Sequence, residues 1–491
     1  MSLFAPKQTQ GLCIDEQQPG VVNLSGTAAA CQLQSGSRRT SRGWSCTRKG
    51  FIEVSLLMLM LAILVVTQER RVTGDGLARY EALTDLLSHQ RVPDTAYSMI
   101  GPVFAAPLWW LGRYAGNTER LLGNYNSLLF CLMLAAFYLM LRRHVDAGLL
   151  RRFLLILISG SMIAPHLADF YGEMFTLSTL GVGLLALALR RPPKGARAGA
   201  WALIVLGVAN TPASIVGLAF VACLEAVRRR RIGPLVSVVT AATLIAGEAW
   251  LRRGGPFVTG YTDNHGAETV MPYSGLSGFS YPFILGVLAI VFSFGKGLLW
   301  FTPGLFLPVR QQLSAASRTD SALDLWHAWL LWTTFTVGLI VVYAQWWAWY
   351  GGMYWGPRFF LIAILPAALG LAIWLSDPRG SSIRTAATLA VLVLSVWVAG
   401  LGLAFDDLWA WTCYQDGYRL EALCHFAPEF SPLWYPLVAK PDLSPRQELQ
   451  LVLHAAVLLW LAAPLMTRLV DNGRVFVRGR RGRLDPRAWH W

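Results

Sequence analysis

The chain has 491 residues, of which 55% are hydrophobic and only 14% are charged, and its mean hydropathy is +0.45. Soluble domains carry roughly 25% charged residues, so this composition excludes a soluble globular protein and predicts an all-α polytopic membrane protein. The net charge of +14 comes from short basic runs between apolar segments, a pattern typical of cytoplasmic loops, so we expect contact with membrane lipids and no nucleic-acid partner.

The N-terminal region precedes the first apolar segment. Residues 1–50 are rich in Ser, Gly, Thr and Gln, and this composition predicts a disordered tail. The apolar run FIEVSLLMLMLAILVVT (51–67) follows, and QERR rather than a small-residue cleavage site comes after it. We therefore expect a retained first span with its N-terminus in the cytoplasm.

Apolar length and basic flanks predict the remaining spans, about twelve in all. They are placed at 121–141, 153–167, 174–189, two short spans in 199–227 broken at Asn210-Thr211-Pro212, 233–251, a re-entrant or interfacial piece and then a span in 281–310, 326–346, 359–375, 385–404 and 449–467. The basic clusters then fall on one side, which predicts a multi-pass protein of the inner or plasma membrane with both termini cytoplasmic.

This arrangement divides the chain into four regions. We expect a disordered cytoplasmic tail (1–50), a transmembrane catalytic core (51–375), C-terminal helices with an outer loop at 405–448 (376–470) and a basic cytoplasmic tail (471–491). The polar chemistry is expected in the outer loops 68–98, 166–173, 252–280, 345–358 and 405–448.

The first outer loop carries the main candidate for catalysis, Asp75 in TGDGLARYE. Gly-Asp-Gly is also good turn chemistry, so a plain turn is the alternative to a carboxylate that acts as a base or metal ligand at the bilayer surface. Tyr80, Glu81 and Tyr97 are further candidates for substrate contact, and short interfacial helices are expected around Pro102 and Pro107. Glu81 is the weaker acid because, six residues on, it does not share the helical face of Asp75.

The second candidate cluster is HLADFYGEMF (166–175). Asp169 and Glu173 are four residues apart, so on one helical turn they share a face, and their mutual repulsion is offset best by a cation or a substrate. His166 is a candidate assistant, and the alternative is that these are solvated loop acids.

The third cluster is QWWAWYGGMYWGPRFF (345–360). Its aromatic density suits an interfacial belt, but the glycines also let backbone approach a ligand closely. Arg358 opens the next span at head-group depth, where a guanidinium suits a phosphate, and snorkelling is the alternative. Tyr350 and Trp355 are candidate substrate contacts.

Lys296 in FSFGKGLLWFTPGLFLP (292–308) lies between two glycines in an apolar run, where a lysine requires a partner. A lipid phosphate is one option and a carboxylate of the 68–98 loop is the other. Cys413 and Cys424 lie in the last outer loop, where an oxidising compartment predicts a disulfide.

As an ordered set, these elements resemble the GT-C glycosyltransferases, in the group that includes aminoarabinose, galacturonosyl and protein mannosyltransferases. The resemblance rests on Asp75 with IGPVFAAPLWWLG, on Asp169 and Glu173, on Lys296 to Pro303 and on Tyr350 to Arg358, and it covers about 51–375. Many members carry a second acid beside the first-loop Asp, whereas Gly76 follows Asp75 here.

The resemblance implies glycosyl transfer from a polyprenyl-phosphate sugar to a glycan, lipid or protein acceptor on the outer, periplasmic face. It implies that Asp75 is the base, that Asp169 or Glu173 orients the acceptor, and that Lys296 and Arg358 neutralise the donor phosphate. Asp75, Asp169 and Glu173 are also the candidate ligands of a divalent cation, Mg²⁺ or Mn²⁺; without it, no cofactor is expected.

Two alternatives belong to other functional classes. A transporter or flippase would place ionisable residues near span centres and show paired internal repeats, and no obvious repeat is present. A polysaccharide polymerase or ligase would concentrate basic residues in one large outer loop, whereas 405–448 is mixed in charge.

Overall fold

The computed structural model describes residues 48–261, 268–276, 278–317, 322–377 and 381–483. Within these ranges the chain is helical, and its β-structure is one isolated antiparallel bridge between Leu189 and Leu323. The predicted disordered tail lies outside the described residues as far as residue 47, and its last three residues already belong to the first helix, α1 (Arg48–Val66). The end of the basic tail, from residue 484, also lies outside them.

Seven helices in the described part of the chain are long and apolar enough to cross a membrane. These spans are Arg48–Val66, Thr118–Leu141, Gly233–Arg253, Leu325–Tyr343, Arg358–Ser376, Ser382–Tyr418 and Pro445–Arg474. Three shorter apolar helices are Glu173–Leu187, Ala196–Asn210 and Phe283–Phe292. The chain is therefore a multi-pass membrane protein, and the count of twelve spans stays a prediction.

The helices follow one another with short connections. Those of the first half are α2 (Gly74–His89), α3 (Ile100–Val103), α4 (Ala106–Tyr114), α5 (Thr118–Leu122), α6 (Tyr125–Leu141), α7 (Ala147–Ser159), α8 (Glu173–Leu187), α9 (Ala196–Asn210), α10 (Ile215–Arg229) and α11 (Val236–Arg253). Those of the second half are α12 (Phe283–Phe292), α13 (Leu298–Phe301), α14 (Arg310–Ala316), α15 (Leu325–Tyr343), α16 (Ile364–Ser376), α17 (Ser382–Tyr418), α18 (Glu421–Phe426), α19 (Tyr435–Ala439) and α20 (Pro445–Arg483). Short 3₁₀ turns are η1 (Ala164–Leu167), η2 (Pro212–Ser214), η3 (Gly233–Leu235), η4 (Pro303–Phe306), η5 (Arg358–Ala363) and η6 (Pro428–Phe430).

The break predicted at Asn210-Thr211-Pro212 is confirmed. α9 ends at Asn210, and α10 begins after the 3₁₀ turn η2. Proline has no backbone N–H and restricts the residue before it, so the helix ends there. The break exposes backbone and side-chain polar groups of residues 210–214 that the site uses.

Two predicted boundaries are wrong. A continuous span ending at Arg310 is not formed, because α12 ends at Phe292 and only the short α13 and η4 follow, in a segment with Gly295, Gly297 and Pro303. The outer loop 405–448 begins as helix, since α17 continues beyond a kink at Phe405. The aromatic, apolar residues that follow Phe405 permit this continuation.

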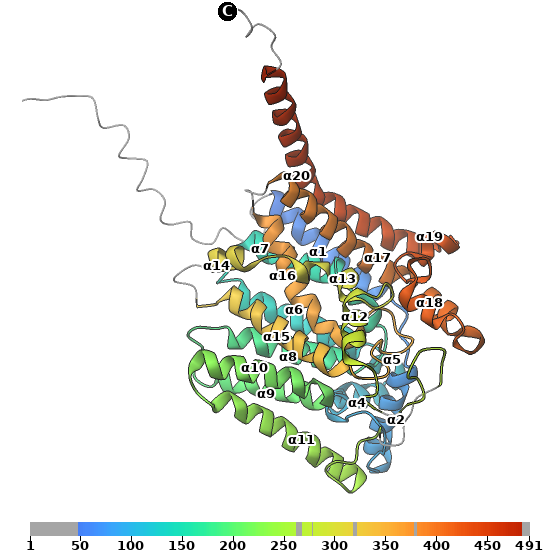
Figure 1. Ribbon diagram of the computed structural model, residues 1–491. Helices are drawn as coiled ribbons and strands as arrows, with labels where there is room; N and C mark the ends of the chain where they lie inside the picture. Colours follow the sequence, from blue (N-terminus) through green and yellow to red (C-terminus); the bar gives the residue numbers. More distant parts are fainter. Residues whose placement is uncertain (1–47, 262–267, 277, 318–321, 378–380, 484–491) are drawn as a thin grey trace, which may run out of the picture.

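One continuous hydrophobic core joins α1, α6–α10 and α15–α17, and a smaller core packs α2 and α4 over Tyr125 and Phe170. In Figure 1, α2, α4, α5, α18 and α19 gather at one end of the molecule, and α14 lies at the other end. We call the end with α2 and α18 the site end. The loops predicted to share one membrane face therefore do lie together.

Candidate active site

Asp75 begins the helix that follows the first span. It lies in the first turn of α2, where a carboxylate is stabilised by the helix dipole, so the predicted Gly-Asp-Gly turn is a helix start. The preceding Gly74 has a φ of +50°, a conformation that favours glycine. A Cβ at Gly74 would lie 2.8 Å from the Tyr354 hydroxyl, so the glycine also permits close approach of the 350–358 segment.

Arg358 joins two of the predicted acids. Its NH1 atom donates to Asp75 Oδ2 at 2.7 Å and lies 3.3 Å from Glu173 Oε1. The guanidinium also lies over the Tyr354 ring, 3.8 Å from its centroid. Arg358 is 9% exposed and opens η5 at the start of a predicted span. It is buried and ion-paired, so snorkelling does not describe its arrangement.

The second oxygen of Asp75 is held by Tyr97. The tyrosine hydroxyl donates to Asp75 Oδ1 at 2.6 Å. Burial opposes ionisation of Asp75, but the charge of Arg358 and the hydrogen bonds from Tyr97 and Arg358 outweigh it. The pKa of Asp75 therefore lies below its ordinary value of 3.8. Asp75 is a carboxylate at neutral pH, and it can accept hydrogen bonds or a proton.

The C-terminal end of α11 supports Tyr97. Arg252 NH1 donates to the Tyr97 carbonyl at 2.7 Å, and Glu248 accepts from the Ser98 hydroxyl and the Met99 amide, both at 2.7 Å. Arg79, one turn after Asp75, donates to the Asp75 carbonyl at 3.2 Å and lies over the Tyr97 ring at 4.2 Å. The sequence analysis missed Arg79 and Tyr354, although the first is at i+4 from Asp75 and the second lies in the aromatic segment before Arg358.

Asp169 occupies a different place from the one predicted. It lies in the loop between η1 and α8, so it does not share a helical turn with Glu173, which is the first residue of α8. Its carboxylate accepts from the Thr73 hydroxyl at 2.6 Å and from the Thr73 and Phe170 amides at 3.1 and 2.6 Å. Burial raises the pKa of Asp169 despite these bonds. Asp169 thus anchors the residue that precedes α2.

Two buried amides that the sequence analysis did not single out tie the loops together. Asn210, at the break before α10, donates to the Gly172 carbonyl and accepts from the Gly101 amide, each at 2.9 Å. Asn126 donates to the Asp169 carbonyl at 2.6 Å. A buried amide left without these partners is costly, which explains why the break at Asn210 is compatible with a well-packed interior.

Lys296 does not lie free in an apolar span. Its ammonium is buried and donates to the carbonyls of Gly352, Tyr354 and Gly356, with distances of 3.1 Å to the first and the last. Neither predicted partner, a phosphate or a carboxylate of 68–98, is needed to explain this geometry. Direct phosphate binding by Lys296 would require the ammonium to give up these acceptors.

The remaining candidates divide into two groups. His166 is buried near Arg358 and Lys296, and burial followed by these charges lowers its pKa to about 3, so it is neutral. Trp355 is buried against Phe301, with ring centroids 5.0 Å apart. Tyr350 packs on His425, away from the Asp75–Arg358 pair in its contacts, with ring centroids 4.7 Å apart. Glu81 is exposed, and Tyr80 packs against the smaller core.

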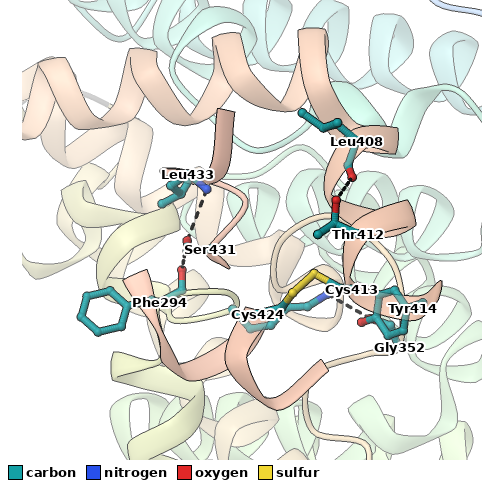
Figure 2. Close-up of a disulfide and its surroundings, with 10 residues drawn as sticks. Phe294, Gly352, Leu408, Thr412, Cys413, Tyr414, Cys424, Ser431 and Leu433 are labelled. Carbon is teal, nitrogen blue, oxygen red and sulfur yellow. Dashed lines mark hydrogen bonds between the residues drawn. A yellow bond between two sulfur atoms is a disulfide. The ribbon is translucent and has the colours of Figure 1, made fainter. Parts of the chain in front are cut away.

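Cys413 and Cys424 form a disulfide at the site end, which links α17 to α18 (Figure 2). Next to it, the Tyr414 hydroxyl donates to the Gly352 carbonyl at 3.0 Å. The disulfide therefore lies one residue from a contact with the segment that carries Arg358.

A small cavity of about 30 Å³ adjoins the ion pairs. Its lining combines Glu173 and Arg358 with the hydroxyl residues Thr176, Thr211 and Ser214, and with apolar side chains of α8, α15 and η5. Glu173 Oε2 and Arg358 Nε are buried and have no hydrogen-bond partner. Such orphaned polar atoms are rare in proteins, and these two lie where a small polar group would satisfy both.

The three predicted metal ligands do not form a common set. Arg358 balances Asp75 and Glu173, and Asp169 is turned to Thr73. The described residues include no group of three His, Cys, Asp or Glu side chains placed to hold a metal ion. The residues present therefore fit a shared guanidinium better than a divalent cation.

Comparisons with known proteins were made for the sequence and for the structure. No protein-family model and no curated protein matches the sequence. The structure is similar to the "Crystal Structure of ArnT from Cupriavidus metallidurans bound to Undecaprenyl phosphate", with 14% sequence identity and a TM-score of 0.47. The match covers 86% of this chain and 79% of that one.

Proposed function

We propose that this protein is a membrane glycosyltransferase that moves a sugar from a polyprenyl-phosphate donor to an acceptor. The observation that carries the proposal is Arg358, buried between Asp75 and Glu173 with its Nε unpaired beside a mostly apolar cavity. A lipid phosphate combines the two chemistries of this place, an anion for the guanidinium and a hydrocarbon chain for the apolar lining.

Arg358 would stabilise the charge that develops when the donor phosphate leaves the anomeric carbon. The cavity is no larger than one or two water molecules need, so the helices around it must separate when a lipid enters. The donor phosphate and Asp75 would then compete for the same guanidinium. Loss of that cation raises the proton affinity of Asp75, so donor binding would make it a better base for an acceptor hydroxyl.

The acceptor side has a separate hollow. A polar groove of about 520 Å³ lies where α1 exits, lined by Gln68, Glu69, Arg70, Val72 and residues of α5, among others. Its volume falls within the range of roughly 300–1,000 Å³ typical of small-molecule sites. Val72 adjoins Thr73 and the start of α2, so we infer that this groove receives the acceptor next to Asp75.

We also infer that the site end faces the periplasm and that both termini are cytoplasmic. The Cys413–Cys424 disulfide at the site end supports this orientation, because disulfides persist in oxidising compartments. The basic runs near Arg190 and Arg228 lie in loops between spans on the other side of the predicted topology, as cytoplasmic loops do.

The experiment that tests the function compares Asp75→Asn and Arg358→Gln with wild type by mass spectrometry of envelope glycans and lipid-linked sugars. Asp85→Asn and Arg91→Ala, on exposed residues of α2 and the turn after it, are matched controls for the charge changes. All variants must reach the membrane at wild-type level. We expect one sugar modification to disappear in both site variants while its lipid-linked donor accumulates. Unchanged glycans and lipid-linked sugars in both would contradict the proposal and favour a transporter.

A further inference from the structure

The ammonium of Lys296 is an organising centre for the segment 350–358, which we call the arginine loop. Lys296 is 1% exposed, and its Nζ donates to three carbonyls of that loop, those of Gly352, Tyr354 and Gly356. An ammonium has three donors, so these carbonyls can use all of its protons. Without Lys296 the three carbonyls would lose a charged donor in a buried place.

The arginine loop needs glycines to turn its carbonyls inward. Gly351, Gly352 and Gly356 have φ values of +75°, +74° and +67°. Other residues rarely adopt this region, and a Cβ at Gly351 would lie 3.0 Å from Cγ of Arg358. The path of the loop thus depends on the glycines for its shape and on Lys296 for its polar contacts.

The loop passes this arrangement on to Arg358 and Asp75. Tyr354 contributes a carbonyl to Lys296 and a ring to Arg358, and its hydroxyl accepts from the Asp75 amide at 3.3 Å. Gly356 contributes a carbonyl to Lys296 and is only two residues before Arg358. A shift of the loop therefore moves the guanidinium relative to both carboxylates.

The disulfide-linked segment holds Lys296 and the arginine loop together. The Gly295 amide donates to the His425 carbonyl at 3.1 Å, and the Ser431 hydroxyl donates to the Phe294 carbonyl at 2.7 Å. Figure 2 shows Ser431 at Phe294, and Tyr414 at Gly352, on either side of the Cys413–Cys424 disulfide. One disulfide-closed segment thus contacts both the turn that carries Lys296 and the loop that it organises.

We propose that Lys296 is a positioning residue, whose ammonium gathers the arginine loop so that Arg358 is presented to Asp75 and Glu173. It acts through the loop and does not touch the donor. This role differs from the phosphate contact expected from the sequence, and only the donor-binding test below rests on the proposed function.

The first test measures amide hydrogen exchange of residues 351–356 in the purified, full-length, ligand-free protein. We expect Lys296→Met to speed exchange there by about tenfold or more, since a charged hydrogen bond is worth roughly 1.5–3 kcal/mol. Tyr414→Phe, which removes one hydroxyl from Gly352, should act in the same direction but less. Lys440→Met and Tyr114→Phe, at exposed positions, are matched controls. If Lys296→Met does not fold, Tyr414→Phe decides; unchanged exchange in the folded variant overturns the proposal.

The second test is a double-mutant cycle of Lys296→Met and Arg358→Gln, with the Kd for a polyprenyl phosphate in detergent as the readout. If Lys296 acts through Arg358, each single change weakens binding, and the double variant binds within about twofold of Arg358→Gln alone. If the losses multiply, Lys296 contacts the phosphate directly and the proposal is wrong. If wild type binds no polyprenyl phosphate, the proposed function fails, while hydrogen exchange still decides the positioning role.

Discussion

Arg358 NH1 lies 2.7 Å from Asp75 Oδ2, although 283 residues separate the two in the chain. Each residue opens a helical element, Asp75 in the first turn of α2 and Arg358 in η5, so their side chains meet at a junction of two termini. Removing one partner of a buried pair leaves an uncompensated charge, which typically costs about 3–5 kcal/mol. The pair is therefore important for both the stability and the proposed chemistry of this junction.

Tyr97 is expected to tune the acid side of the pH profile. The pKa of Asp75 lies below 3.8 partly because Tyr97 donates to its carboxylate, so Tyr97→Phe should raise that pKa. The acid limb of the activity profile should move to higher pH by about half to one unit, since one unit corresponds to about 1.4 kcal/mol. Activity measured across pH in Tyr97→Phe and wild type checks this, and an unmoved limb would mean that Asp75 ionisation does not control the rate.

The same pKa predicts a direction for stability. Asp75 has a lowered pKa in the folded protein, so it contributes stability that is fully present above its ordinary value of 3.8. This contribution is lost as the pH falls below that value through the folded pKa. Thermal unfolding of wild type and Asp75→Asn, compared at neutral pH and below pH 3.8, should therefore show a difference that shrinks in acid. A constant difference would assign the stabilisation to something other than the charge of Asp75.

Gly76 is expected to be intolerant of any side chain. A Cβ there would lie 2.1 Å from Asp169 Oδ1 and 3.2 Å from the Phe170 amide nitrogen. Gly76→Ala should therefore push α2 away from the loop before α8, destabilise the protein by roughly 1–3 kcal/mol and lower activity by displacing Asp75. Gly199→Ala in α9 is the control, because its Cβ would meet nothing within 4 Å and alanine favours helix. Equal melting temperatures for the two variants would contradict this packing.

Activity should survive removal of divalent cations. The charge of Arg358 balances Asp75 and Glu173, and Asp169 is engaged by Thr73, so the described acids do not share a metal. Chelation with EDTA, followed by the glycan assay in membranes, should leave transfer within about twofold of the untreated sample. Loss of activity that Mg²⁺ or Mn²⁺ restores would support the metal site that the sequence suggested.

The disulfide is expected to stabilise the site end. Eleven residues separate Cys413 from Cys424, and closing a loop of this size contributes about 2–4 kcal/mol. The double variant Cys413→Ser/Cys424→Ser should melt at a lower temperature and should become insensitive to reductant, whereas wild type loses stability on reduction. Cys223→Ser, at an exposed free cysteine, is the control. Equal melting temperatures would show that the disulfide is dispensable.

The sequence by itself determined the membrane class, the helical architecture and the break at Asn210. These features depend on local properties, namely apolar length, basic flanks and the missing N–H of Pro212, which act over a few residues. The spans at 51–67, 174–189 and 326–346 were accurate to a few residues for the same reason. Boundaries at 281–310 and 405–448 failed because hydropathy does not reveal where a helix kinks or stops inside an apolar run.

Only the tertiary structure decided which polar groups meet. Asp75, Glu173 and Arg358 come from three elements, and their ion pairs depend on packing of helices far apart in the chain. Composition likewise could not show that Asp169 would turn to Thr73 or that Lys296 would find three carbonyls. A buried charge takes the partners that the fold brings within hydrogen-bond distance, and a one-dimensional pattern does not specify those distances.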